Sequence, residues 1–166
     1  MPSLLRVLLF GIGQLPLSVL HGLATVVGTL FWWIPNERKR VALLHLDLCL
    51  PELSQVERRE IARQSLIHLA KALIEAPAIW FGPQKRLRGW IDDPQAAAKL
   101  RDIISQGGSI VLCPHIGSWE LAGMFCAVQG TITSLYKPQK GAIDALILEG
   151  RRRLGAHLVP TTGAGV

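Results

Sequence analysis

Residues 109–136, SIVLCPHIGSWELAGMFCAVQGTITSLY, decide the fold predicted for this chain. An apolar run, Ser109–Cys113, predicts a short strand, and the helix-like run Trp119–Gln129 follows it. Thr131–Tyr136 then has the alternation of a second strand. A strand, a helix and a second strand in this order predict parallel pairing across a helical crossover.

The segments on either side extend the same alternation. Residues 142 to about 152 predict a helix, and Ala156–Val159 predicts a third strand. Upstream, Asp93 and Pro94 predict a helix start, because aspartate caps helices and proline suits their first turn. We therefore predict an α/β chain, with a membrane-associated N-terminal helix or helices followed by a partial parallel βαβαβ sheet.

Chemistry is expected at His115 and Glu120, which lie in the stretch CPHIGSWE. Sites in open parallel sheets form beyond the carboxyl ends of the strands, where His115 falls, and Glu120 lies in the first turn of the next helix. A carboxylate that holds imidazole Nδ1–H leaves Nε2 free to take a proton from an alcohol. The alternative is a loop histidine and an ordinary first-turn carboxylate, because H-x4-E spacing often arises by chance.

Three basic residues are candidates for substrate binding. Lys137 follows the second predicted strand, where it would meet a phosphate or a carrier acid, or simply face solvent. Arg151 and Arg153 belong to the run GRRR, which suits phosphate binding. A helix that returns from a strand should end at the opposite edge of the sheet, which places these arginines away from His115 unless the helix is short or bent. A plain basic helix end is the alternative.

The N-terminal region is predicted to associate with a membrane. Residues 7–34 contain no charged side chain and exceed the roughly 20 residues that a spanning helix needs. Pro16 and four glycines interrupt the run, so it forms either one kinked helix or two shorter helices. Trp32 and Trp33 end it and residues 38–40 are basic, which predicts that the following part faces the cytoplasm. A cleaved signal peptide is disfavoured, and a buried core hairpin is the alternative.

These patterns divide the chain into three predicted parts: a membrane anchor at 1–36, a helical connecting region at 37–92 and a partial α/β domain at 93–166. Within the second part, Ser54 and Glu57 form a capping box that opens a helix, and Pro77 is expected to end it.

Several classes of function are disfavoured. The net charge is +6, yet no nucleic-acid-binding module is present, so no nucleic-acid partner is expected. The three cysteines are widely spaced and no HExxH motif occurs, so neither a metal nor a redox cofactor is expected. There is also no Walker A loop, no GxGxxG and no G-x-S-x-G.

The chain resembles the bacterial lipid A biosynthesis acyltransferases, the lauroyl/myristoyl (HtrB-like) group of the lysophospholipid acyltransferase superfamily. The resemblance covers nearly the whole chain and is carried by four segments. They are HLDLCLPEL (45–53), CPHIGSWE (113–120), YKP (136–138) and GRRRLGAHLVPTT (150–162).

This resemblance implies an enzyme of the bacterial inner membrane whose catalytic part faces the cytoplasm. It would transfer a fatty acyl chain from acyl carrier protein, or coenzyme A, to a hydroxyl of a glycolipid, with His115 as base and Glu120 as its partner. Either Arg151 or Arg153 matches a functional arginine of relatives. A phosphatidylinositol mannoside or lysophospholipid acyltransferase remains an alternative, since only the acceptor would differ. Family members are about twice as long, so an inactive membrane-bound fragment is a further alternative.

Overall fold

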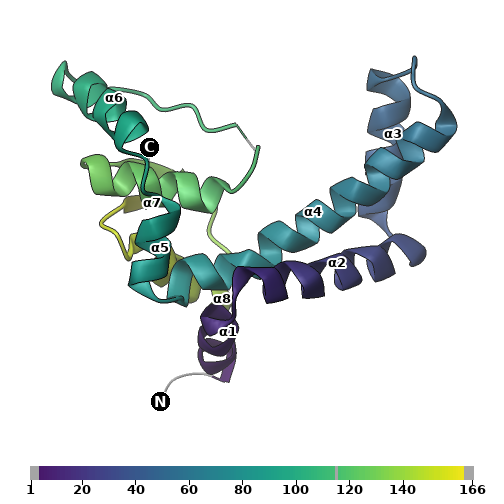
Figure 1. Cartoon of the computed structure of the whole chain (residues 1–166), viewed down its shortest axis with the longest axis horizontal. Helices are drawn as coiled ribbons and strands as arrows, with labels where there is room; N and C mark the ends of the chain where they lie inside the picture. Colours follow the sequence, from purple (N-terminus) through teal and green to yellow (C-terminus); the bar gives the residue numbers. More distant parts are fainter. Residues whose placement is uncertain (1–3, 115, 163–166) are drawn as a thin grey trace. The chain divides into compact units, whose positions relative to one another are not determined.

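The computed structural model describes residues 4–114 and 116–162, which form a mostly helical α/β protein with a small parallel sheet (Figure 1). The elements found in these ranges are α1 (Leu4–Gln14), α2 (Leu17–Trp33), α3 (Glu37–Cys49), α4 (Gln55–Phe81), α5 (Gln84–Trp90), α6 (Pro94–Ser105), α7 (Trp119–Gln129), β1 (Thr133–Tyr136), α8 (Ala142–Arg152) and β2 (His157–Pro160).

The chain divides into two compact units. The described residues of Met1–Gln14 and Pro77–Val166 form the first, here called the sheet unit. Leu15–Ala76 form the second, here called the helical unit.

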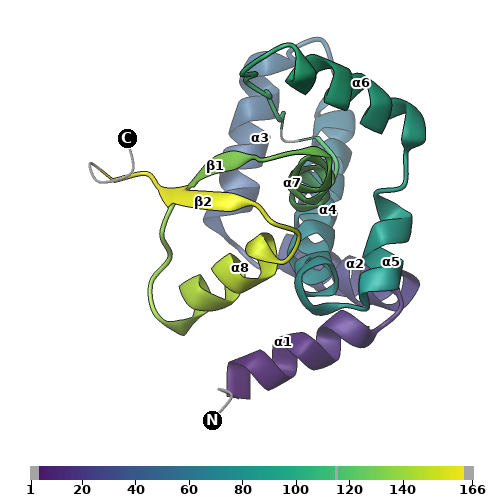
Figure 2. The ribbon, with the colours of Figure 1, turned by 90° about the vertical axis from the view of Figure 1, so that its left-hand side faces the viewer.

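The sheet consists of β1 and β2, which run parallel with Thr133 opposite His157 and Tyr136 opposite Pro160. α8 connects the two strands and packs against β2 (Figure 2). The predicted β-α-β arrangement of the second and third strands is therefore confirmed.

The first predicted strand, Ser109–Cys113, is wrong for the described structure. Residues 108–114 have no regular secondary structure, and Ile110 and Leu112 are 93% and 87% exposed. Strand preference depends on cross-strand neighbours and on a face to bury against, and this segment has neither among the described residues. The βαβαβ prediction thus reduces to a two-stranded βαβ unit.

The predicted end of a helix at Pro77 is also wrong, because α4 continues to Phe81. Proline removes one backbone N–H donor from the helical ladder, but later contacts hold the next turn in place. Ala78 and Ile79 are buried, and the Gly82 N–H donates to the Ala78 carbonyl at 3.1 Å. Tertiary packing outweighs the local preference.

The predicted starts of α4 and α6 are confirmed by their caps. The backbone N–H of Ser54 donates to Glu57 Oε2 at 2.8 Å, and the Glu57 N–H donates to Ser54 Oγ at 3.3 Å. Asp93 Oδ1 accepts from the N–H of Ala96 at 2.9 Å. Each cap satisfies donors that the first turn of a helix leaves without an acceptor.

The apolar N-terminal run forms two helices, α1 and α2, which separate at Leu15 and Pro16. Among the described helices, none is by itself both long and apolar enough to cross a bilayer. Taken together, α1 and α2 reach that length and composition, with a sharp bend between them.

The core of the helical unit lies between α2 and α4. Trp32 packs with Ala62 and Leu66, and Gly28 lies so close to Ile67 that an added Cβ would come within 2.6 Å of its Cα. The other side of α2 is apolar and exposed, with Val26, Leu30 and Trp33 among its side chains. This helix therefore has one face packed against α4 and one without a partner among the described residues.

Candidate active site

The predicted chemistry lies in the sheet unit, beside an apolar cavity of about 530 Å³. The segment that includes Val111 and Leu112, helix α7 and both strands form its walls. Its lining residues are Val111, Leu112, Cys113, Pro114, Ile116, Trp119, Glu120, Ala122, Gly123, Met124, Cys126, Ile132, Ser134, Leu135, Tyr136, Arg151, Ala156 and Leu158. Such a cavity, with few polar groups in an apolar wall, suits a ligand with an apolar body.

Glu120 is a buried charged residue in the wall of this cavity. It lies in the first turn of α7. It is 9% exposed, and no other charged residue among the described positions is buried to this extent. A buried carboxylate is costly unless donors satisfy it. Two side chains donate to it, one from α4 and one from α8.

The first of these is Arg151, on the last turn of α8. Its Nε lies 3.1 Å from Glu120 Oε1 and 3.0 Å from Oε2, and its terminal NH2 group also donates to Oε1. The second is Trp80, near the end of α4, whose indole Nε1–H donates to Oε2 at 3.0 Å. The carboxylate is therefore held on two sides and oriented by two different helices.

Arg151 reaches Glu120 because α8 packs against α7, so that the last turn of α8 lies beside the first turn of α7. The separation that the strand connectivity predicts is between the arginine run and His115, which lies outside the described residues. That separation stays a prediction.

Arg153 makes different contacts. Its NH1 group donates to the backbone carbonyls of Ile79 and Trp80 at 3.0 and 3.1 Å, and its NH2 group donates to the Gly82 carbonyl at 2.7 Å. Burial lowers the pKa of Arg153 from its usual value. The structure thus places this predicted substrate-binding residue against the end of α4, where a cation complements the helix dipole.

The two other predicted site residues are Lys137 and His115. Lys137 is exposed after β1, and in the described part of the chain its ammonium group makes no hydrogen bond or ion pair. Its neighbour Tyr136 lines the cavity. His115 lies outside the described residues, whereas Pro114 and Ile116 on either side of it line the cavity.

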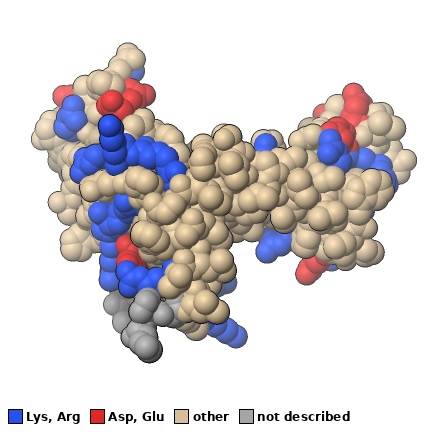
Figure 3. Space-filling model, turned by 60° about the horizontal axis from the view of Figure 1, so that its bottom comes forward, with Lys and Arg blue, Asp and Glu red and all other residues tan. Residues whose placement is uncertain are grey.

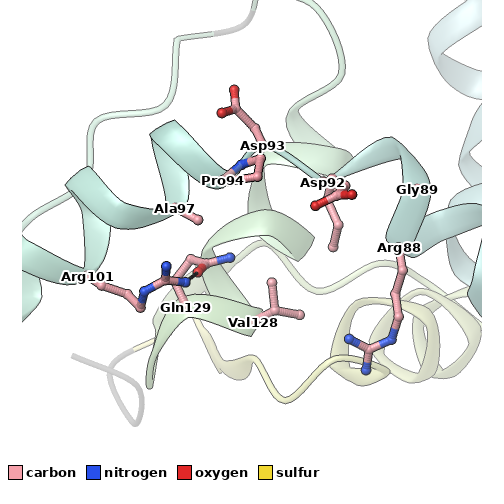
Figure 4. Close-up of a pocket in the computed structure, with 10 residues that line it drawn as sticks. Arg88, Gly89, Asp92, Asp93, Pro94, Ala97, Arg101, Val128 and Gln129 are labelled. Carbon is pink, nitrogen blue, oxygen red and sulfur yellow. Dashed lines mark hydrogen bonds between the residues drawn. The ribbon is translucent and has the colours of Figure 1, made fainter.

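A second cavity in the same unit, of about 570 Å³, contains none of the predicted site residues (Figure 4). Arg101 of α6 donates to Gln129 at 2.6 Å on one side of it, and Arg88 of α5 lies on the other. Asp93, which also lines it, is engaged in capping α6. We place the candidate site at Glu120, because the second cavity is shallow and has no buried reactive group.

Across residues 4–114 and 116–162, no three His, Cys, Asp or Glu side chains lie close enough to hold a metal ion.

The two units differ in charge. The sheet unit carries 11 Lys and Arg against 6 Asp and Glu, whereas the helical unit carries 7 against 6. Figure 3 shows basic side chains gathered in clusters on the face that it views. The excess positive charge of the sheet unit favours anionic substrates.

An apolar cavity with a buried, oriented carboxylate in its wall suits a ligand that has an apolar body and a polar group. The chain belongs to the bacterial lipid A biosynthesis acyltransferase family, whose model matches residues 2–164. The resemblance seen in the sequence is therefore confirmed.

Curated relatives support this membership. The chain is 29% identical over 157 residues to the lipid A biosynthesis palmitoleoyltransferase of Escherichia coli (strain K12), which covers 90% of this chain and 51% of the relative. It is 29% identical over 142 residues to the lipid A biosynthesis lauroyltransferase of the same organism, covering 84% of the chain and 46% of the relative. A lipid A biosynthesis acyltransferase of Haemophilus influenzae is 25% identical over 142 residues, covering 84% and 45%.

The chain spans about half the length of the curated relatives that it matches. No solved structure matches it significantly.

Sequence reasoning missed one member of the site, Trp80. Trp80 lies among aromatic and basic residues at 78–92, a composition that by itself suits ordinary packing or a membrane interface. The contact with Glu120 joins positions 40 residues apart, and no local spacing predicts it. The sequence offers one general indication of this contact, because the indole N–H of a buried tryptophan usually finds a hydrogen-bond acceptor.

Proposed function

We propose that the protein transfers a fatty acyl chain from a thioester, carried by acyl carrier protein or coenzyme A, to a hydroxyl of a lipid A precursor. The observation that carries the proposal is the Glu120 carboxylate, buried and hydrogen-bonded in the wall of an apolar cavity. The family supports the same class of reaction, and the printed names of the relatives favour lipid A over other acceptors.

In the proposed reaction, Nε2 of His115 takes the proton of the acceptor hydroxyl. The oxygen then attacks the thioester carbonyl carbon, and the resulting oxyanion is stabilised by N–H groups in the first turn of α7 or by a basic side chain. When the carbon–sulfur bond breaks, the carrier thiolate leaves and takes the proton from the imidazolium, so no cofactor is consumed. General base catalysis of this kind contributes roughly 10²–10⁴ in rate.

Glu120 is proposed to orient His115 while it keeps its other partners. Three N–H groups make four hydrogen bonds to the carboxylate, because Nε of Arg151 is shared between the two oxygens. These bonds match the roughly four lone-pair sites of an ionised carboxylate. In the proposed reaction, Nδ1–H of His115 takes the place of one half of the shared bond, which would orient the ring and stabilise the imidazolium that forms.

The cavity provides the apolar surface that an acyl chain needs. Leu112, Met124, Leu135 and Leu158 line it, and each CH₂ group buried there contributes about 0.8 kcal/mol. In this proposal, Arg151 serves the site by holding Glu120, whereas Lys137 and Arg153 bind anionic groups of the carrier or the acceptor only if their side chains reorient.

We also propose that the enzyme acts at the cytoplasmic face of the bacterial inner membrane. The exposed apolar side of α2 would contact lipid, with Val26, Leu30 and Trp33 among its residues. Residues 1–36 then form the anchor and 93–166 carry the chemistry, as the sequence predicts. The basic excess of the sheet unit suits the anionic lipids of that surface.

The proposal is tested with the full-length protein, an acyl carrier protein thioester and a lipid A precursor, with products identified by mass spectrometry. His115→Ala and Glu120→Gln should each reduce acyl transfer by at least about 10²-fold. Retention of wild-type transfer by His115→Ala would refute the assigned base. Transfer only to lysophospholipid or to phosphatidylinositol mannosides would refute the assigned acceptor.

A further inference from the structure

We propose that Trp80 is a positioning residue for Glu120, and that its indole N–H fixes the orientation of the carboxylate that the proposed reaction uses. The inference rests on the proposed function, because it assigns a role to a group within that site. It starts from one contact, in which Trp80 Nε1 donates to Glu120 Oε2 at 3.0 Å.

The indole donates from a position that the surrounding structure fixes. Gly150 of α8 lies directly against it, and a Cβ added at Gly150 would overlap the Cβ and Cγ atoms of Trp80. Phe81 packs edge-on against the indole, with ring centroids 6.4 Å apart. The ring therefore has little freedom to turn away from Glu120.

The helix that carries Trp80 is held just as closely. Arg153 donates to the backbone carbonyls of Ile79, Trp80 and Gly82, which are the acceptors that the end of a helix leaves without partners. Three residues of the run GRRR therefore contact Trp80, its backbone or its partner Glu120. Gly150 receives the indole, Arg151 holds the carboxylate, and Arg153 holds the backbone beneath the indole.

Arg151 holds the carboxylate from one side. Its Nε lies 3.1 and 3.0 Å from the two oxygens and its NH2 group donates to Oε1, whereas no atom of Arg151 donates to Oε2 alone. The indole donates to Oε2 and comes from a different helix. Donors from two elements therefore fix the rotation of the carboxyl group and hence the direction from which a further donor can approach it.

Trp80 does not line the cavity beside Glu120, so it should affect the chemical step more than substrate binding. A misplacement of a reacting group by about 1 Å can cost roughly 10²-fold in rate. We expect loss of the indole donor to lower kcat by roughly 10- to 100-fold, with KM for the acyl donor changed by less than about twofold.

The test uses Trp80→Phe in the full-length protein, because phenylalanine retains an aromatic ring and lacks the N–H. Trp90→Phe is the matched control. Trp90 packs in the same hydrophobic cluster, and its ring contacts the guanidinium of Arg86 at 5.2 Å, away from Glu120. Replacement of Trp80 by 3-benzothienylalanine provides a second variant, since it keeps the shape of the indole and replaces N–H with sulfur.

Glu120→Gln is measured in the same assay to separate the two claims. Loss of kcat in Trp80→Phe and in the benzothienyl variant, with Tm and Trp90→Phe near wild type, supports the inference. Full activity of the benzothienyl variant overturns the inference, whatever the stability of Trp80→Phe. Full activity of Glu120→Gln overturns the proposed function itself, whereas loss there with unchanged Trp80 variants overturns only the positioning role.

Discussion

Removal of Arg151 should destabilise the sheet unit, because the side chain neutralises a carboxylate that is largely buried. The Glu120 side chain is 8% exposed, and Arg151→Ala would leave it with Trp80 as its one side-chain donor among the described residues. Loss of one partner from a fully buried ion pair costs about 3–5 kcal/mol. Because the Arg151 side chain is 29% exposed, water replaces part of the lost interaction, and we expect about 2 kcal/mol.

The assay is thermal unfolding of the full-length protein, followed by circular dichroism. A loss of about 2 kcal/mol should lower Tm by roughly 4–8 °C. Arg152→Ala is the control, since Arg152 is exposed on the same helix, and it should change stability by less than about 0.5 kcal/mol. If Arg151→Ala unfolds at the wild-type temperature, Glu120 is not a buried charge that depends on this arginine.

Two further predictions concern packing and capping. Gly150→Ala should destabilise the protein by roughly 1–3 kcal/mol in urea denaturation, because the new methyl group overlaps the side chain of Trp80. Gly123 lies in α7, and a Cβ added there would have no atom within 4 Å. Gly123→Ala should therefore stabilise the protein by roughly 0.5–1 kcal/mol. Equal effects of the two substitutions would contradict the packing of Gly150 against Trp80. The side-chain and backbone hydrogen bonds of Ser54 lower the pKa of Glu57, so the contribution of the cap is present above the usual carboxyl pKa and is lost as the pH falls through the folded-state value. The protection factors of amides in the first turn of α4, which compare observed with intrinsic exchange at each pH, should therefore fall in acid, and Ser54→Ala should abolish that pH dependence.

Local chemistry in the sequence predicted the elements around the site well. α7 begins at Trp119 and ends at Gln129 as predicted, and the Asp93 and Ser54 caps open their helices. These elements have their signals within a few residues, in caps and in helical periodicity. They were predictable because no distant contact competes with those signals.

The failures all involve contacts between distant residues. Ser109–Cys113 has the composition of a strand, but a strand needs a neighbour that composition cannot supply. Pro77 lies within α4 because later packing holds the turn that follows it. The partners of Glu120 come from 40 residues before it and 31 residues after it, so only the folded chain brings the site together.

In the proposed reaction, the cavity beside Glu120 receives the acyl chain of the donor. Photo-crosslinking of the full-length protein tests this placement, with an acyl carrier protein thioester whose chain carries a diazirine and with peptide mapping of the products. We expect crosslinks to the walls of this cavity, at residues such as Leu112, Met124 and Leu135, and their loss when unlabelled donor competes. Crosslinks confined to the cavity of Arg88 and Arg101, or to surfaces away from Glu120, would show that the acyl chain binds elsewhere.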